Sequence, residues 1–370
     1  MAEVEIGIGR PARRAYGLDE ISIVPSRRTR DTADVDISWQ LEALSMRLPL
    51  LAAPADSVVS PATAAEIGRL GGAAVLDLEG LWTRHEDPAP LLDRISSCGD
   101  GEVTTVLREA YSAPVRPELV TSRIAELRAG AVAACGSVSP QRAAELVPVA
   151  VGAEIDVLVI RAGVVSAEHV TRSGEALDMK RFIREIDVPV VVGCCASYHT
   201  ALHLMRTGAV GILVGGVGAA STAGEVLGAG VPQATALADA AAARTRHLEE
   251  TGVYVDVIAD GSIATGGEIA KAVACGADAV MLGAPLAAAA EAPGGGTHFE
   301  RAGAHARLPQ ARRLRVPARG SLEQILLGPA DEPDGRVGLF GALRASMATC
   351  GYATIREFHK AELVVSAPPA

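Results

Sequence analysis

Short apolar segments recur along most of this chain, and their regular spacing restricts the folds open to it. Each is short and rich in branched side chains, which suits strands buried on both faces. The eight segments are residues 48–53, 73–76, 131–134, 157–160, 188–192, 210–214, 255–259 and 279–282. Helical spacing separates most of them, as at residues 62–70, 141–146, 180–186 and 201–207. Regular alternation of single strands with helices predicts an α/β fold, a (β/α)8 TIM barrel in a single domain.

The chain of 370 residues has room for one large barrel or for two ordinary domains. A two-domain Rossmann protein is the competing interpretation, but no GxGxxG motif follows the early strands. We therefore expect a lead-in segment at residues 1–45, a barrel core at 46–292, and a flap-like loop with a closing segment at 293–370. Residues 344–360 have the pattern of a closing helix.

Composition and charge narrow the possible partners. The formal net charge of −10 argues against nucleic acid as a partner. No apolar run approaches the ~18 residues of a membrane span, and no signal peptide is expected. The six cysteines include no CxxC pair, so we expect neither a metal site nor a disulfide framework. These features together predict a cytoplasmic protein without a membrane segment.

Residues 255–288 contain the most informative local pattern. A buried strand ends at Asp260-Gly261-Ser262, a helical stretch follows, and a second strand ends at Gly283-Ala284. Both glycine turns fall at the carboxyl ends of their strands, where parallel barrels commonly bind phosphate and where helix N-termini favour anions. We interpret this stretch as a phosphate cradle, with Asp260 beside it to accept a hydrogen bond from a sugar hydroxyl.

The chain resembles the IMP dehydrogenase/GMP reductase family, through motifs that are collinear with the family over nearly the whole length. Because no inserted CBS pair is present, it looks most like the CBS-less IMP dehydrogenase-related branch found in actinobacteria. The resemblance is carried by PLLAAPADSV, IGRLGG, VPVVVGC, GGVGAASTAGEVLGAGVPQATA, ADGSI, GEIAKAVACGADAVMLGAPLA, EAPG and GALRASM.

This resemblance implies a purine nucleoside 5′-monophosphate as ligand (IMP, GMP or XMP), NAD or NADP as cofactor, and a homotetramer. It implies that Asp260 holds the ribose hydroxyls. The positions that match the substrate-binding glycine turns and loop of the family are Gly218, Gly261, Ser262, Gly283 and Ala284.

Several positions depart from the family pattern. Ser221, followed by Thr222, occupies the place of the nucleophilic cysteine, whose thiolate would add to the purine ring. The same loop often coordinates a monovalent cation in the dehydrogenases, which Gly216, Gly218 and Ser221 leave possible. Arg161 replaces an acidic loop that faces the nicotinamide cofactor, which suits an additional phosphate or an ion pair.

Cys195 is a candidate alternative nucleophile. It aligns with a pocket asparagine of the family, so we expect its side chain to point towards the nucleotide, where Arg161 would make the thiol more acidic. A small residue that merely fills space is the competing interpretation.

Three functions remain open at this point. The first is NAD(P)-linked oxidoreductase chemistry on a purine mononucleotide, altered by the serine at position 221. The second is a catalytically inactive nucleotide-binding regulator or partner of IMP dehydrogenase. The third is an FMN-type phosphate-binding barrel oxidoreductase.

Overall fold

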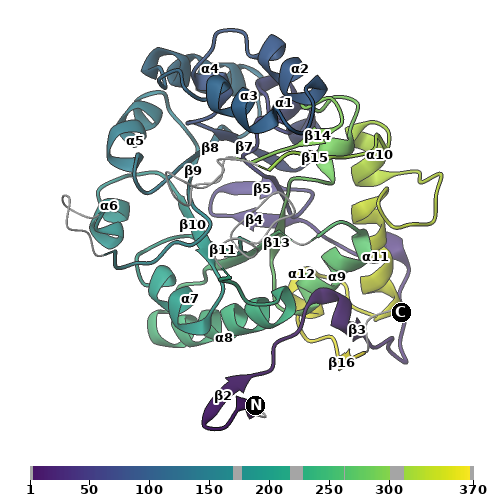
Figure 1. The fold of residues 1–370 in the computed structure, drawn as a ribbon. Coiled ribbons are helices and arrows are strands. Elements are labelled where there is room, and N and C mark those ends of the chain that lie inside the picture. Colours follow the sequence, from purple (N-terminus) through teal and green to yellow (C-terminus); the bar gives the residue numbers. More distant parts are fainter. Residues whose placement is uncertain (1–2, 170–176, 217–227, 262, 301–311, 367–370) are drawn as a thin grey trace.

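Eight parallel strands close into a barrel in the computed structural model, which describes residues 3–169, 177–216, 228–261, 263–300 and 312–366 (Figure 1). The predicted (β/α)8 barrel is therefore confirmed. The strands, in barrel order, are β6 (Leu50–Ala52), β7 (Ala73–Asp77), β8 (Cys135–Val138), β9 (Val157–Arg161), β10 (Val190–Cys195), β11 (Gly211–Gly215), β12 (Asp256–Asp260) and β13 (Ala279–Leu282).

The third strand lies further along the chain than the apolar pattern predicts. Residues 131–134 were expected in the strand, but β8 begins at Cys135. Helix α4 (Pro117–Ala129) ends immediately before them, and Ala131 has a φ of 53°, so these residues turn the chain back to the barrel. Cys135 is then in register with Val75 and Val157 on its two neighbours. Apolar residues alone do not distinguish such a turn from a strand.

Helices surround the barrel (Figure 1). The outer helices are α1 (Pro61–Leu70), α5 (Ala143–Gly152), α6 (Met179–Arg184), α7 (Tyr198–Met205), α8 (Gln233–Thr251), α9 (Gly266–Ala274) and α11 (Leu339–Thr349). Helix α1 shows why these segments are helical. Ser60 caps it by accepting a 3.1 Å hydrogen bond from the Thr63 amide, and Gly71 ends it with a φ of 106°. Its buried face contains Ala64, Ile67 and Leu70.

The interior of the barrel is apolar and closed at its amino end. Val159, Val191 and Leu213 belong to this inner cluster. The hairpin of β4 (Trp39–Leu41) and β5 (Leu44–Met46) contributes its buried side chains to the same cluster, and Trp39 Nε1 donates a 3.0 Å hydrogen bond to Asp256 Oδ1 at the start of β12. A larger cluster fills the space between strands and helices. With the amino end covered, the opposite end is where a site is expected in this fold.

A helical insertion follows β7 and forms a third apolar cluster. It contains η3 (Leu81–Thr83), α2 (Ala89–Ser97) and α3 (Val103–Ala110), and it encloses Phe299, which is fully buried. Phe299 comes from the segment after β13, which begins with η5 (Leu286–Ala288) and continues to β14 (Thr297–His298), paired with β15 (Leu314–Arg315). The insertion therefore holds the chain beyond β13 in place.

The C-terminal part packs beside the N-terminal part. After α10 (Leu322–Leu327) and α11, the expected single helix over residues 344–360 is interrupted, and a short α12 (Ile355–Phe358) follows. Gly351 causes the break: its φ is 76°, and a Cβ there would lie 2.4 Å from the Arg28 carbonyl oxygen. Strand β16 (Leu363–Val365) then pairs with β3 (Ile21–Ile23), which lies between η1 (Leu18–Glu20) and η2 (Thr32–Asp34).

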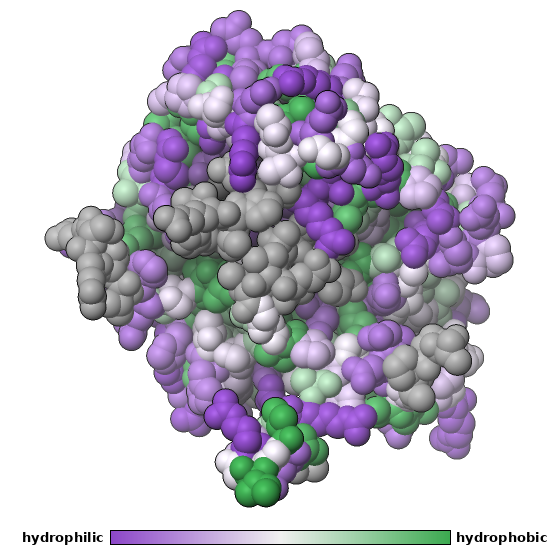
Figure 2. Space-filling view, in the orientation of Figure 1, coloured by the Kyte–Doolittle hydropathy of each residue, from purple (hydrophilic) through white to green (hydrophobic). Residues whose placement is uncertain are grey.

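A hairpin of β1 (Glu3–Gly7) and β2 (Arg10–Arg13) projects from the body of the molecule (Figure 1). Arg13 anchors its base through an ion pair with Asp239 of α8. The projecting end carries exposed Ile6 and Ile8, which contribute to the apolar colouring of this protrusion (Figure 2). Within the described ranges, none of the helices is both long and apolar enough to cross a membrane.

Candidate functional site

Asp260 lies inside the carboxyl end of the barrel. Ile258, two residues earlier on β12, belongs to the inner cluster, and strand side chains alternate between faces, so Asp260 points inward as well. Gly261 follows with a φ of 96° and turns the chain away. The Gly216 amide donates a 3.1 Å hydrogen bond to the Asp260 carbonyl oxygen, which ties the end of β11 to the same place. Asp260 therefore lies at the carboxyl end of the barrel, directly before the glycine turn at Gly261.

Arg161 forms an ion pair with the Asp260 carboxylate. It points inward from the end of β9, donates to Asp260 Oδ2 from Nε at 2.8 Å, and donates to Oδ1 from Nη2 at 3.3 Å. The Arg161 side chain is 14% exposed and that of Asp260 4%, so the pair is largely removed from water. Of the two interpretations of Arg161, the ion pair is the one that its contacts with Asp260 support.

Glu300 is the second carboxylate on Arg161. Its Oε2 accepts from Arg161 Nη2 at 3.1 Å, and its Oε1 lies 3.2 Å from His298 Nε2. Burial alone would raise the pKa of the Glu300 carboxyl, but Arg161 and His298 outweigh it and hold that pKa well below its usual range. Glu300 therefore stays ionised. We call Asp260, Arg161, Glu300, His298 and Cys194 the mouth network.

The two adjacent cysteines do not lie as expected from the sequence. Strict alternation from Val191 would turn Cys195 inward, but the register between β10 and β11 shifts between Gly193 and Cys195. As a result Cys194 faces the barrel interior and donates a 3.0 Å hydrogen bond from Sγ to Asp260 Oδ2. Cys195 instead lies in the apolar layer between strands and helices.

Neither thiol is activated. Burial raises the pKa of Cys195 to about 12. Burial and the Asp260 carboxylate raise the pKa of Cys194 well above its usual range, although Arg161 opposes them. Because the thiolate is the nucleophile and both groups are protonated near neutral pH, Cys195 lacks the chemistry considered for it, and Cys194 acts here as a hydrogen-bond donor.

Gly283, at the end of β13, is in contact with the chain's own side chains. A Cβ at Gly283 would lie 2.9 Å from His298 Cε1, 3.1 Å from His298 Nε2 and 3.4 Å from Glu300 Oε1. The absence of a side chain at position 283 thus makes room for His298 and Glu300. Ala284 follows in the partly buried turn before η5, which is only three residues long.

The helix after β12 uses its N-terminal donors internally. The amides of Ala264 and Thr265 both donate to Glu268 Oε2, at 2.7 and 2.9 Å, and Thr265 Oγ1 accepts from the Glu268 amide at 3.2 Å. This is a complete capping box. Helix N-termini were expected to support phosphate after both glycine turns, but the first is capped by Glu268 and the second precedes only η5. Any anion binding here must come from the turns and the side chains.

Four predicted site residues, Gly218, Ser221, Thr222 and Ser262, lie outside the described residues. Sequence reasoning did not find Glu300, His298 or Cys194. For Glu300 the only signal is a carboxylate in an otherwise Arg-rich segment, which does not indicate a partner. Within the described ranges, no group of three or more His, Cys, Asp or Glu side chains is placed to hold a metal ion.

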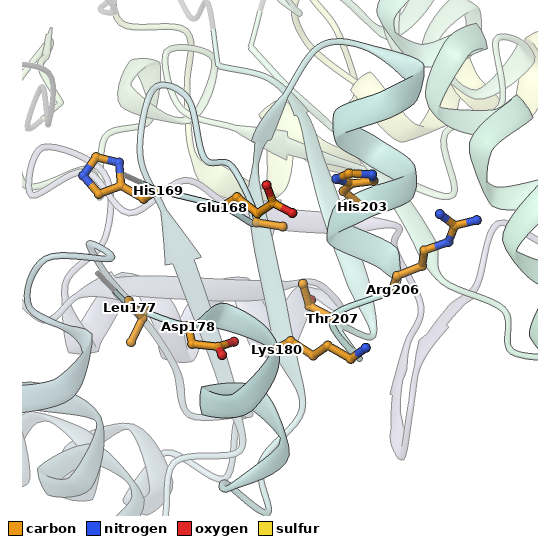
Figure 3. A pocket seen from close by; sticks show the side chains of 9 residues that line it. Glu168, His169, Leu177, Asp178, Lys180, His203, Arg206 and Thr207 are labelled. Carbon is orange, nitrogen blue, oxygen red and sulfur yellow. The ribbon is translucent and has the colours of Figure 1, made fainter. Parts of the chain in front are cut away.

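A cavity of about 540 Å³ lies elsewhere, between the loop after β9 and helices α6 and α7 (Figure 3). None of its lining residues belongs to the mouth network. They are Ala167, Glu168, His169, Leu177, Asp178, Lys180, His203, Arg206 and Thr207. Its charges are mixed, and Arg206 is already paired with Glu250 at 2.7 Å.

Comparisons with known proteins agree with this architecture. The chain is 51% identical over 373 residues to a protein named uncharacterized oxidoreductase from Mycobacterium leprae, covering 98% of this chain and 100% of that protein. It is 32% identical over 292 residues to inosine-5′-monophosphate dehydrogenase of Haemophilus influenzae, covering 70% of this chain and 54% of that enzyme. A crystal structure of an IMP dehydrogenase/GMP reductase-like protein from Corynebacterium glutamicum has a TM-score of 0.94 at 46% identity and covers 98% of each chain.

A family model described as the IMP dehydrogenase / GMP reductase domain matches residues 15–308. This match spans most of the chain, including the barrel and the mouth network up to Glu300. The chain belongs to the IMP dehydrogenase/GMP reductase family.

Proposed function

We propose that this chain binds a purine nucleoside 5′-monophosphate (IMP, GMP or XMP) at the carboxyl end of its barrel. The observation that carries the proposal is the inward-facing Asp260 carboxylate at the end of β12, followed by the positive-φ turn at Gly261. Asp260 matches the family position that accepts hydrogen bonds from the ribose, and Gly283 directly follows the neighbouring strand β13. A sugar and a phosphate held at adjacent strand ends suit this fold.

The covalent chemistry of the family is not supported by the residues present. Its first step requires a thiolate that adds to the purine ring, and Ser221 occupies that position. A serine hydroxyl is a weak nucleophile without an adjacent base. Cys194 and Cys195 cannot replace it near neutral pH, because burial raises the pKa of both thiols. We infer that the family reaction is altered or lost.

The nicotinamide side of the site also departs from the family. Where relatives place a carboxylate loop towards NAD or NADP, this chain places Arg161, which is held by Asp260 and Glu300. The ion-paired guanidinium of Arg161 therefore stands where relatives direct an acidic group towards the cofactor. A second candidate function, a nucleotide-sensing paralogue or partner of IMP dehydrogenase, is favoured by this replacement.

Calorimetric titration with IMP, GMP and XMP tests the proposal, and each titration is followed by an absorbance assay with NAD⁺, NADP⁺ or NADPH. Saturable binding of one purine mononucleotide is expected. Binding without change in nicotinamide absorbance supports the sensor, whereas turnover supports an oxidoreductase that uses a different nucleophile. If none of the three nucleotides binds, the proposed function is wrong.

A further inference from the structure

The side chain of Glu300 lies at the strand end where the proposed site would hold a phosphate. Glu300 Oε1 is within 3.4 Å of a Cβ built on Gly283, and Oε2 is 3.1 Å from Arg161 Nη2. Glu300 thus lies beside the glycine turn after β13 and accepts from a guanidinium, a donor that binds carboxylates and phosphates alike.

Glu300 is held there by the segment that carries it. Phe299 is fully buried among η3, α2 and α3, and its amide donates a 3.1 Å hydrogen bond to Ser57 Oγ. Ser57 Oγ also lies 3.3 Å from His298 Nδ1, while the opposite ring nitrogen faces Glu300. These contacts orient the carboxylate towards Arg161 and Gly283 even though Glu300 itself belongs to no helix.

Arg161 retains donors for a ligand. Its Nε and Nη2 are used by Asp260 and Glu300, and Nη1 has no hydrogen-bond partner among the residues that the structure describes. The Arg161 side chain is 14% exposed, so part of it is accessible to solvent. The charges of Asp260 and Glu300 exceed the single charge of Arg161, which disfavours a further anion while Glu300 is in place.

We propose that Glu300 is the resident anion of this site, and that a phosphate monoester binds by displacing the Glu300 carboxylate from Arg161 and Gly283. The proposal rests on the proposed function, because it concerns the phosphate half of the same ligand site. A phosphate carries more charge and more acceptor oxygens than a carboxylate, so it competes effectively for a guanidinium. The competition lowers the apparent affinity of the unmodified chain.

Substitution Glu300→Gln tests this directly, because it removes the charge and preserves the shape. We expect the affinities for inorganic phosphate and for IMP, measured by calorimetry in sulfate-free buffer, to increase about tenfold or more, as when a competing bound state is removed. The double variant Arg161→Met/Glu300→Gln should lose that gain. Glu323→Gln is the matched control: its side chain is 56% exposed and paired with Arg69, and it should bind both ligands like the unmodified chain. Glu300→Ala, checked for native circular dichroism, removes the charge without introducing the glutamine amide. It should show the same gain in affinity, even if that amide perturbs the segment in Glu300→Gln.

The outcomes separate this inference from the proposed function. If IMP binds the unmodified chain and neither Glu300 variant binds phosphate or IMP more tightly, the inference is overturned and the proposed function stands. If inorganic phosphate binds the Glu300 variants more tightly while IMP binds none of the proteins, the inference holds and the purine ligand is wrong. If neither ligand binds any of the proteins, both are overturned.

Discussion

Removal of the Arg161 guanidinium should be among the most damaging single changes in this barrel. Substitution Arg161→Met keeps a long apolar side chain but leaves the Asp260 and Glu300 carboxylates without their cation. Both carboxylates are largely removed from water, with side-chain exposures of 4% and 12%. Breaking a buried ion pair by removing one partner costs about 3–5 kcal/mol. We expect the free energy of unfolding to fall by about that amount near neutral pH.

The pH dependence of this loss has a definite sign. In the unmodified chain the folded-state pKa of Glu300 is depressed, so its contribution is present above the unfolded pKa and is lost as the pH falls through the folded pKa. Without Arg161 the largest influence that lowers the folded-state pKa of Glu300 is lost, so that pKa rises. As the pH falls from neutral, protonation of Glu300 removes the charge that the Arg161→Met variant leaves without its guanidinium partner. The difference between the two proteins should therefore shrink on acidification.

Urea unfolding followed by circular dichroism, at several pH values, measures both the loss in free energy of unfolding and its dependence on pH. Arg69→Gln is a suitable control, because Arg69 forms ion pairs at the surface with Glu66 and Glu323, and its loss should produce no measurable change. A cycle with Glu300→Gln isolates the pairwise coupling. If Arg161→Met costs less than about 1 kcal/mol, as expected for an exposed pair, or if its cost is independent of pH, the description of a buried network is refuted.

Three further predictions concern other groups. Burial and a neighbouring carboxylate raise the pKa of Asp256 from 3.8 to about 7, so the free energy of unfolding should decrease as the pH rises between these values. Asp256→Asn keeps an acceptor for Trp39 and should flatten the dependence of the urea midpoint on pH. An unchanged slope would contradict this prediction. Native protein treated with iodoacetamide near neutral pH should be alkylated at half-buried Cys98 and not at Cys195. Peptide mass spectrometry measures the labelling, and rapid labelling of Cys195 would show that its thiol is accessible. Asp260→Asn should weaken IMP binding by roughly 1.5–3 kcal/mol if the carboxylate accepts ribose hydrogen bonds, and equal affinity in calorimetry would remove Asp260 from the site.

Local patterns were sufficient for most of the barrel. Seven of the eight predicted segments overlap strands of the structure, whereas the third was displaced because residues 131–134 form an apolar turn. The closing helix over residues 344–360 was wrong for a different reason. Gly351 interrupts it because the Arg28 carbonyl approaches too closely for a side chain, and nothing near Gly351 in the sequence encodes that contact.

The sequence by itself determined the architecture and the location of Asp260 and Gly283. Strand–helix alternation is a local property, and parallel strands place all their carboxyl ends at one end of a barrel. Only the tertiary structure decided what surrounds Asp260. Arg161 is 99 residues from Asp260 and 139 from Glu300, and a register shift at the end of β10 turns Cys194 inward in place of Cys195. Burial of a charge is costly unless its partners are present, so the ionisation of each group depends on the others and is set only once the barrel has closed.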